Sequence, residues 1–370
     1  MILIPLITYG QGGFGVDSNN KILDNGKIRF SNSNSSSPTI SFTGMPNQPW
    51  FLNTLLDPDA YIELTFSTNA LKSAFGAGYD GSPSGVGVWN AQGDIVELKN
   101  DDASKHLNNK QYDTSDFNAT SGNKGHGTIT VSGTITVNGK LLQVNHSYIL
   151  GQNDSYVKII TTVKNISSST VVNLRYWVGT RDDRIGSGGG AGSGDHPTKT
   201  RGNIVGGAFS PLTNQNDNAS ALKIFVPLSY PGLSPSVSGN GVGTGVLFFT
   251  NSSRGNTVHA AHGRFSRSYT KSPSLAIITT GSQDGSYAMF VRMNDLAVGA
   301  SDSFTWFYAA AKLTELNAVA SQIANASINI DNITKTYGDN AFTISATSSS
   351  TGAITYSAVN SSVATITSNT

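Results

Sequence analysis

Residues 128–137 read Thr-Ile-Thr-Val-Ser-Gly-Thr-Ile-Thr-Val, and this stretch decides the fold class of the chain. Apolar and hydroxyl side chains alternate along it with the period of two that is typical of a half-buried β-strand. The alternation predicts that Ile129, Val131, Ile135 and Val137 face a core, with a break in the strand at Gly133.

Two Asn-Gly pairs predict β-hairpins, one directly after this stretch and one near the N-terminus. Asn138-Gly139 separates residues 128–137 from residues 140–144, and Asn25-Gly26 lies in the middle of residues 22–30. Asn-Gly is the preferred pair for a two-residue turn in which both central residues have positive φ. We therefore expect each pair to form such a turn.

Further strands are expected at intervals of roughly ten residues. They are residues 156–164, 171–178, 222–226, 245–250, 275–279, 287–293 and 304–310. This density predicts an all-β fold, a large double-sheet β-sandwich or supersandwich domain over residues 1–311.

One stretch has a helical period. Leu313, Leu316, Ala320 and Ile323 form an apolar stripe, which predicts a short connecting helix within residues 312–326. After it, residues 327–370 are richer in Ser and Thr and form a separate segment.

Composition limits the function classes. The formal net charge of the 370-residue chain is +1, so nothing favours a nucleic-acid partner, and the absence of Cys excludes disulfides and thiolate chemistry. No apolar run approaches the roughly 20 residues of a membrane span. Residues 1–9 have no basic residue and contain Pro5, unlike a signal peptide. We expect a protein of a virion or an extracellular surface, without membrane insertion.

Residues 327–370 resemble the first half of a bacterial Ig-like repeat of the kind found in tandem in large adhesins and fibre proteins. The resemblance is carried by Tyr337-Gly338, by Thr355-Tyr356-Ser357 and by the Asn-Ser-Ser-Val-Ala-Thr-Ile of residues 360–366. It implies a stalk, and since the family unit has further strands, the segment is expected to be truncated.

Residues 156–165, Tyr-Val-Lys-Ile-Ile-Thr-Thr-Val-Lys-Asn, resemble a strand of the supersandwich of mutarotase-like proteins. The resemblance implies a fold only. The acid and base residues of that family have no counterpart here, because the chain has only three Glu and scattered His, so no catalytic residue is predicted.

The candidate site follows the strand of residues 171–178 and borders a Gly-rich stretch, residues 186–194. Its residues are Arg181, Asp182, Asp183, Arg184, Asp195, His196 and Arg201. Paired acids and bases beside a loop form structural ion pairs, or bind a glycan or Ca²⁺ through carboxylate oxygens. The structural interpretation is favoured. No other cofactor and no metal is predicted.

Two functional hypotheses follow. In the first, the chain is a non-enzymatic structural or adhesive component of an extracellular or virion fibre or surface layer, which self-associates or binds other fibre subunits and contacts a host glycan. In the second, it is a carbohydrate-active enzyme with an Ig-like spacer. The scarcity of Glu favours the first, because a glycosidase needs a pair of carboxyl groups.

Overall fold

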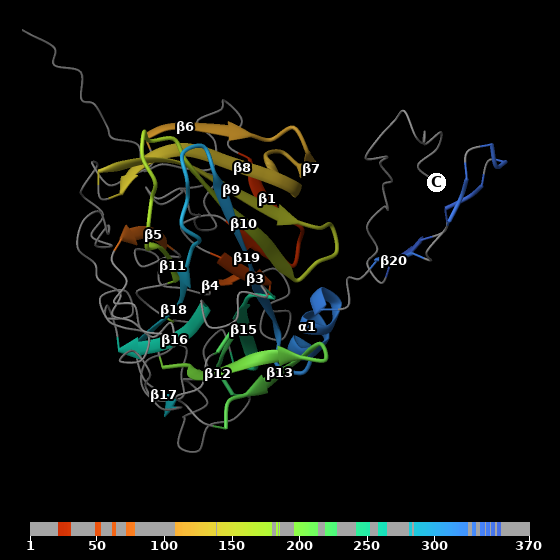
Figure 1. Ribbon diagram of the computed structural model, residues 1–370. Coiled ribbons are helices and arrows are strands. Elements are labelled where there is room, and N and C mark those ends of the chain that lie inside the picture. Colours follow the sequence, from red (N-terminus) through yellow and green to blue (C-terminus); the bar gives the residue numbers. More distant parts are fainter. Residues whose placement is uncertain are drawn as a thin grey trace, which may run out of the picture.

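The chain folds into an all-β double-sheet sandwich in the computed structural model (Figure 1). The structure describes residues 21–30, 49–52, 61–63, 72–77, 108–137, 139–179, 183, 185, 196–213, 219–227, 242–251, 258–264, 281–282, 285–324, 328–330, 334–336, 338–340, 342–344 and 346–348. Within these residues the only helix is α1 (Leu316–Ala324). The expected fold class is therefore confirmed.

The large sheet has 15 strands and is almost wholly antiparallel. Twelve of them follow one another in the spatial order β13 (Ala208–Pro211), β12 (Thr198–Val205), β14 (Ala221–Phe225), β15 (Thr244–Phe249), β19 (Ser301–Lys312), β10 (Tyr156–Asn165), β9 (Lys140–Leu150), β8 (Lys124–Val137), β1 (Ile22–Asp24), β2 (Ile28–Phe30), β3 (Pro49–Leu52) and β4 (Tyr61–Glu63). The other three pair at the side of this series: β17 (Gly281–Ser282) pairs with β12, and β6 (Asn108–Asp113) and β7 (Phe117–Ser121) pair with β8. The parallel pair is β1 with β8.

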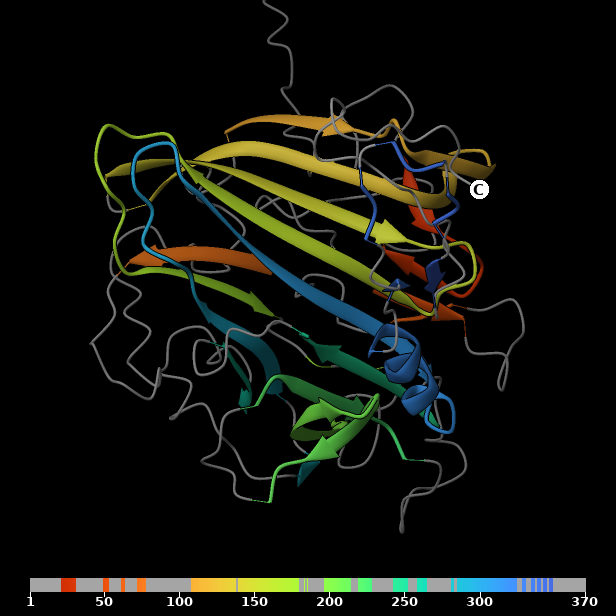
Figure 2. The ribbon, with the colours of Figure 1, turned by 45° about the vertical axis from the view of Figure 1, so that its right-hand side comes forward.

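The second sheet has four strands, in the order β16 (Val258–Arg264), β18 (Gly285–Arg292), β11 (Leu174–Gly179) and β5 (Lys72–Ala77). All of its pairs are antiparallel. Figure 2 shows this sheet stacked against the long central strands of the large sheet.

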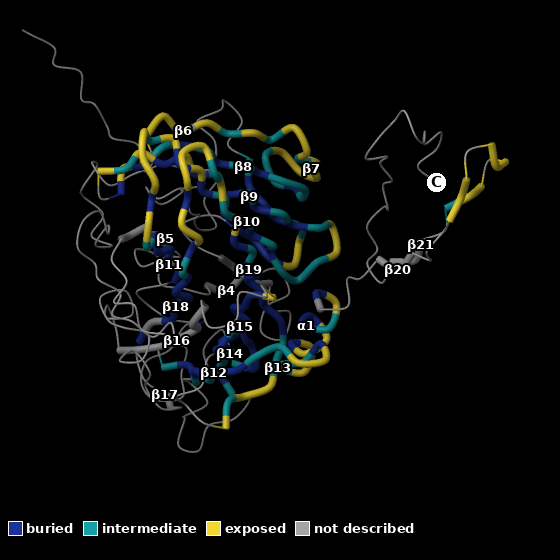
Figure 3. The backbone as a smooth tube through the Cα atoms, in the orientation of Figure 1, coloured by how far each residue is buried: buried dark blue, intermediate teal, exposed yellow. Residues whose placement is uncertain are grey.

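The main core lies between the two sheets. It joins residues of the large sheet, such as Ile129, Val157 and Phe248, to Tyr176 and Met289 of the second sheet. Figure 3 shows this interior as a buried centre with exposed turns at its edges.

Strand β8 confirms the alternation on which the fold class was based. Ile129, Val131, Ile135 and Val137 are all buried. The expected break at Gly133 is wrong, because β8 runs through this residue and pairs it with Val144 of β9. A Gly inside a long strand keeps its hydrogen bonds when neighbours on both sides hold the register.

The two hairpins differ in detail from the expectation. Gly139 has a φ of 72° in a two-residue turn between Val137 and Lys140, and Asn138 lies outside the described residues. In the first hairpin Asp24 pairs with Arg29, so the turn is longer than two residues. Gly26 alone has positive φ there, at 82°. An Asx turn replaces the expected geometry, because the Asn25 side chain occupies the backbone donors that follow it.

Most of the other predicted strands are confirmed. They correspond to β10, β14, β15, β18 and β19. The strand expected at residues 171–178 begins at Leu174, and Val171 makes an isolated bridge to Leu296. Residues 275–279 lie outside the described residues.

Helix α1 begins later than predicted, because β19 extends to Lys312 and a turn follows it. The helix contacts β13, β15 and β19, beside which Figure 2 shows it. Val319, Ala320 and Ile323 pack with Leu247 and Phe307 in a second apolar cluster on the outer face of the large sheet. The helix thus covers part of the sheet in addition to linking segments.

Beyond α1, β20 (Ile328–Ile330) pairs antiparallel with β21 (Ala346–Ser348) in a sheet of their own. Of the residues on which the Ig-like resemblance rests, Gly338 is described, whereas Tyr337, residues 355–357 and residues 360–366 lie outside the described residues. The Ig-like assignment and the domain boundaries stay predictions.

Candidate functional site

Strand β12 carries two cations into the interior. Lys199 and Arg201 are separated by one residue, so both project from the same face of the sheet. Their neighbours on β14 are Ile224 and Leu222, which belong to the main core. Lys199 is 2% exposed and Arg201 is 1% exposed. The large sheet therefore presents two buried cations on β12, the strand next to its β13 edge.

Asp183 forms a buried ion pair with Lys199. Asp183 Oδ2 contacts Lys199 Nζ, and both side chains are almost fully excluded from solvent. Lys199 Nζ also donates a hydrogen bond to the carbonyl oxygen of Pro197, at 3.3 Å. Removing one partner of a buried ion pair typically costs about 3–5 kcal/mol, because the other charge stays buried. The pair thus connects Asp183 to β12.

The remaining predicted site residues divide into two groups. His196 is partly buried and directly precedes Pro197 and β12. Arg181, Asp182, Arg184 and Asp195 lie outside the described residues. The structure therefore brings Asp183 into the interior beside β12, and the sequence reasoning missed its partner, Lys199. The signal was present, since a Lys two residues before Arg201 on a strand shares its face.

No group of three or more His, Asp or Glu among the described residues could hold a metal ion. Four of the seven predicted site residues are outside those residues. The Ca²⁺ site stays a prediction.

A second polar arrangement connects the two sheets through side chains that the sequence did not single out. His146 Nδ1 lies 3.0 Å from Thr161 Oγ1, and Thr161 Oγ1 donates to the Tyr176 hydroxyl oxygen at 3.2 Å. His146 and Thr161 come from neighbouring strands of the large sheet, while Tyr176 comes from β11. All three are fully buried. The chain of hydrogen bonds therefore crosses the sandwich.

Aromatic rings fill the same interior. Trp306 is fully buried and its ring lies 5.4 Å from that of Phe248, centroid to centroid. Burial raises the pKa of the Tyr148 hydroxyl well above its ordinary value, and the nearby Tyr176 adds to this effect. The Tyr148 phenol is therefore neutral at physiological pH.

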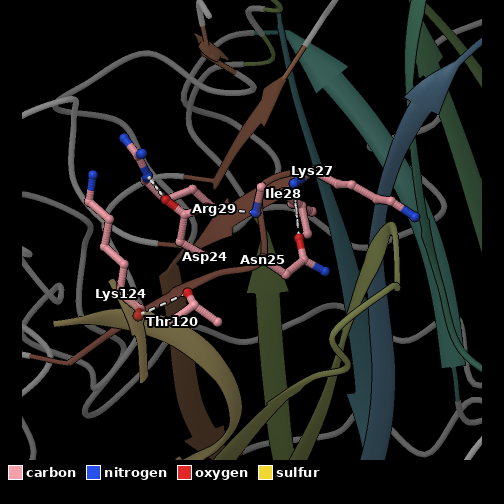
Figure 4. Close-up of polar contacts among 8 residues, drawn as sticks. Asp24, Asn25, Lys27, Ile28, Arg29, Thr120 and Lys124 are labelled. Atoms are coloured by element: carbon pink, nitrogen blue, oxygen red, sulfur yellow. Dashed lines mark hydrogen bonds and ion pairs between the residues drawn. The ribbon is translucent and has the colours of Figure 1, made fainter. Parts of the chain in front are cut away.

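The first hairpin holds another buried ion pair. Asp24 Oδ2 accepts a hydrogen bond from Arg29 Nε at 2.7 Å, and both side chains are nearly buried. Figure 4 shows the pair on facing strands, next to the turn where Asn25 Oδ1 accepts from the backbone nitrogens of Lys27 and Ile28. The hairpin tip is fastened further, because Asn25 Nδ2 donates to the carbonyl oxygen of Gly151 at 2.8 Å. This is a structural contact.

The outer face of the large sheet carries hydroxyl groups in register. Thr130 Oγ1 and Ser147 Oγ lie 2.9 Å apart, as do Thr162 Oγ1 and Ser303 Oγ. These residues alternate with the buried positions of β8, β9, β10 and β19. Ser303 is exposed and the other three are partly exposed, so this face offers neutral donors and acceptors.

No protein-family model and no curated protein matches the chain. In the described residues, no helix is long and apolar enough to cross a membrane.

Several solved structures are similar at low identity. A galactose mutarotase-like protein from Lactobacillus casei is 11% identical, with a TM-score of 0.39 and coverage of 78% of this chain and 99% of that chain. A putative aldose 1-epimerase from Escherichia coli K12 is 10% identical, with a TM-score of 0.39 and coverage of 79% and 99%.

A TPR-domain containing protein from Parabacteroides distasonis is 10% identical, with a TM-score of 0.36, and the match covers 78% of this chain and 46% of that one.

Proposed function

We propose that the chain is a non-enzymatic structural component of an extracellular or virion fibre or surface layer, and that its exposed sheet face contacts a host glycan. The observation that carries this proposal is the buried Asp183–Lys199 ion pair. An acid and a base that are buried and paired with each other have a structural role, whereas the acid and base of a catalytic pair have to reach a substrate.

The other interior polar groups support the same reading. His146, Thr161 and Tyr176 hydrogen-bond to one another across the sheets, with 0% exposure of each side chain. Buried polar networks of this kind give a core a unique packing when their members are paired.

The hydroxyl pairs of the outer face support the glycan contact. Thr130 with Ser147, and Thr162 with Ser303, offer uncharged hydrogen-bonding groups that match the hydroxyls of a neutral sugar. If this face binds glycan, the double variant Thr130→Val, Ser147→Ala loses signal on a glycan array. The inner-face variant Val131→Ile serves as the control and keeps the signal. Equal signals for all three proteins would contradict the contact.

The experiment that tests the structural role combines the mass of the purified protein in solution with electron microscopy of the native particle or cell surface, using an antibody against residues 1–311. An oligomeric mass with labelled filaments or surface features is expected. A monomer with diffuse labelling that degrades or isomerises a carbohydrate would overturn the proposal in favour of the carbohydrate-active enzyme.

A further inference from the structure

We propose that Asp183 and Lys199 are the site of a covalent self-modification, an amide bond between their side chains formed with release of one water molecule. The proposal stands whether or not the chain belongs to a fibre. It assigns a chemical consequence to the buried ion pair, whose two side chains are 0% and 2% exposed.

The fold brings the two reacting groups together and holds them there. Lys199 lies on β12 between β14 and β17, where its backbone is paired with Ile224 and Gly281. Asp183 lies two residues before Ile185, which is 0% exposed and part of the main core. The backbones of Lys199 and Asp183 are therefore held in place, so the amine and the carboxyl group are already in contact in the folded protein. Such positioning is equivalent to a very high local concentration of one group around the other.

The reaction proceeds through the neutral forms of the two groups. A proton that passes from Lys199 Nζ to Asp183 Oδ2 converts the pair into an amine and a carboxylic acid with no change in net charge. The amine is then a nucleophile, and the acid has a hydroxyl group that can leave as water.

The bond changes balance without a co-reactant. Lys199 Nζ attacks Asp183 Cγ, a carbon–nitrogen bond forms, and the carbonyl electrons move onto oxygen. Arg201 lies two residues from Lys199 on the same face of β12 and is also buried. When the carbonyl re-forms, the carbon–oxygen bond to the hydroxyl breaks, and the hydroxyl leaves with a proton from nitrogen as water.

The cross-link would close the segment between residues 183 and 199, which contains the Gly-rich residues 186–194. This chain has no Cys with which to form a disulfide. Covalent closure of a loop stabilises a fold mainly by restricting the unfolded chain. The amide would have the same effect in any redox environment.

The test begins with the intact wild-type chain, so it does not depend on whether a variant folds. The purified protein, shown to be folded by its β-type circular dichroism, is denatured and weighed by mass spectrometry. The expected mass is lower than that of the sequence by one water molecule. Digestion with trypsin is expected to release residues 182–184 covalently joined to residues 185–201, because trypsin does not cleave after an acylated Lys199.

Four variants complete the test. Lys199→Met and Asp183→Ala are expected to have the full mass, and Asp183→Asn to lose ammonia in place of water, because the amide nitrogen is then the leaving group. Lys223→Met removes a half-buried Lys on the neighbouring strand β14 and should keep the loss of water. A folded wild type of full mass would overturn the proposal, and so would a water loss that persists in Lys199→Met.

Discussion

Tyr287 of β18 and Tyr308 of β19 come from different sheets, and their hydroxyl oxygens lie 2.8 Å apart in the fully buried interior. The ring of Phe248 packs near both, with centroid distances of 5.5 Å and 6.0 Å. Burial raises the pKa of Tyr308, and the hydrogen bond with Tyr287 acts in the opposite direction. The contact is a neutral hydrogen bond that joins the sheets, as do those of the His146, Thr161 and Tyr176 chain.

Removing both hydroxyls of this pair should destabilise the protein by less than the two single removals added together. Tyr308→Phe takes away the partner of a buried hydroxyl, and we expect a loss of about 1–3 kcal/mol in the free energy of unfolding. In the double variant Tyr287→Phe, Tyr308→Phe neither hydroxyl remains, so the loss should be smaller than the sum of the two single losses. Urea unfolding of the four proteins measures this coupling. Additive losses would show that the hydroxyls do not interact.

Thr161 and Thr162 are adjacent on β10 but face opposite sides of the sheet, so the same substitution can be compared at both. Thr161→Val breaks the chain from His146 to Tyr176 in the interior, and we expect a loss of about 1–3 kcal/mol. Thr162→Val removes only the contact with Ser303 on the outer face, where water replaces it, and the change should stay within about 0.5 kcal/mol. Thermal or urea unfolding of the wild type and the two variants measures these losses of stability. Equal effects would contradict the inward orientation of Thr161.

Alkaline pH should weaken the fold through Tyr156. Burial, together with the neighbouring Asp154, raises the pKa of Tyr156 from 10.0 to about 12. Because the folded-state pKa is the higher one, this contribution to stability is fully present below pH 10.0 and is lost as pH rises to about 12. Tyr156→Phe should therefore lose less stability than the wild type across this interval. Parallel curves of unfolding free energy against pH would contradict the prediction.

The hairpin ion pair should be sensitive to the loss of either partner. Arg29→Met leaves the carboxylate of Asp24 in a nearly buried position, and we expect a loss of about 3–5 kcal/mol. Lys164→Met, at an exposed position of β10, is the matched control and should change stability by no more than about 0.5 kcal/mol. Urea unfolding measures both. If the two variants are equally stable, the Asp24–Arg29 contact does not contribute.

Much of the strand pattern could be predicted from the sequence, because alternation and turn chemistry are local properties. Residues 128–137 have one apolar and one hydroxyl face wherever the strand is placed, and Ile129 and Val131 are buried accordingly. The start of α1 was harder to predict. The apolar residues before the helix could form either the end of a buried strand or the first turn of a helix. In the structure, the residues up to Lys312 belong to β19.

The candidate site was predictable only in part. The cluster of acids and bases around Asp183 stood out, yet the partner of Asp183 depends on which strands become neighbours. Lys199 belongs to β12, which is ordered by its pairing with β14 and β17. Likewise, nothing in the local sequence linked Thr161 to Tyr176, because that contact requires two sheets to stack.

The sequence by itself determined that the chain forms β-strands, where several hairpins turn and which side chains of each strand face a core. These features depend on period-two alternation and on residues such as Gly139 that accept positive φ. Only the tertiary structure decided that β1 pairs in parallel with β8, that Lys199 meets Asp183, and that Tyr287 meets Tyr308. Alternation specifies which face is buried but not against what, since many pairings bury the same apolar area and the packing of the whole chain selects one.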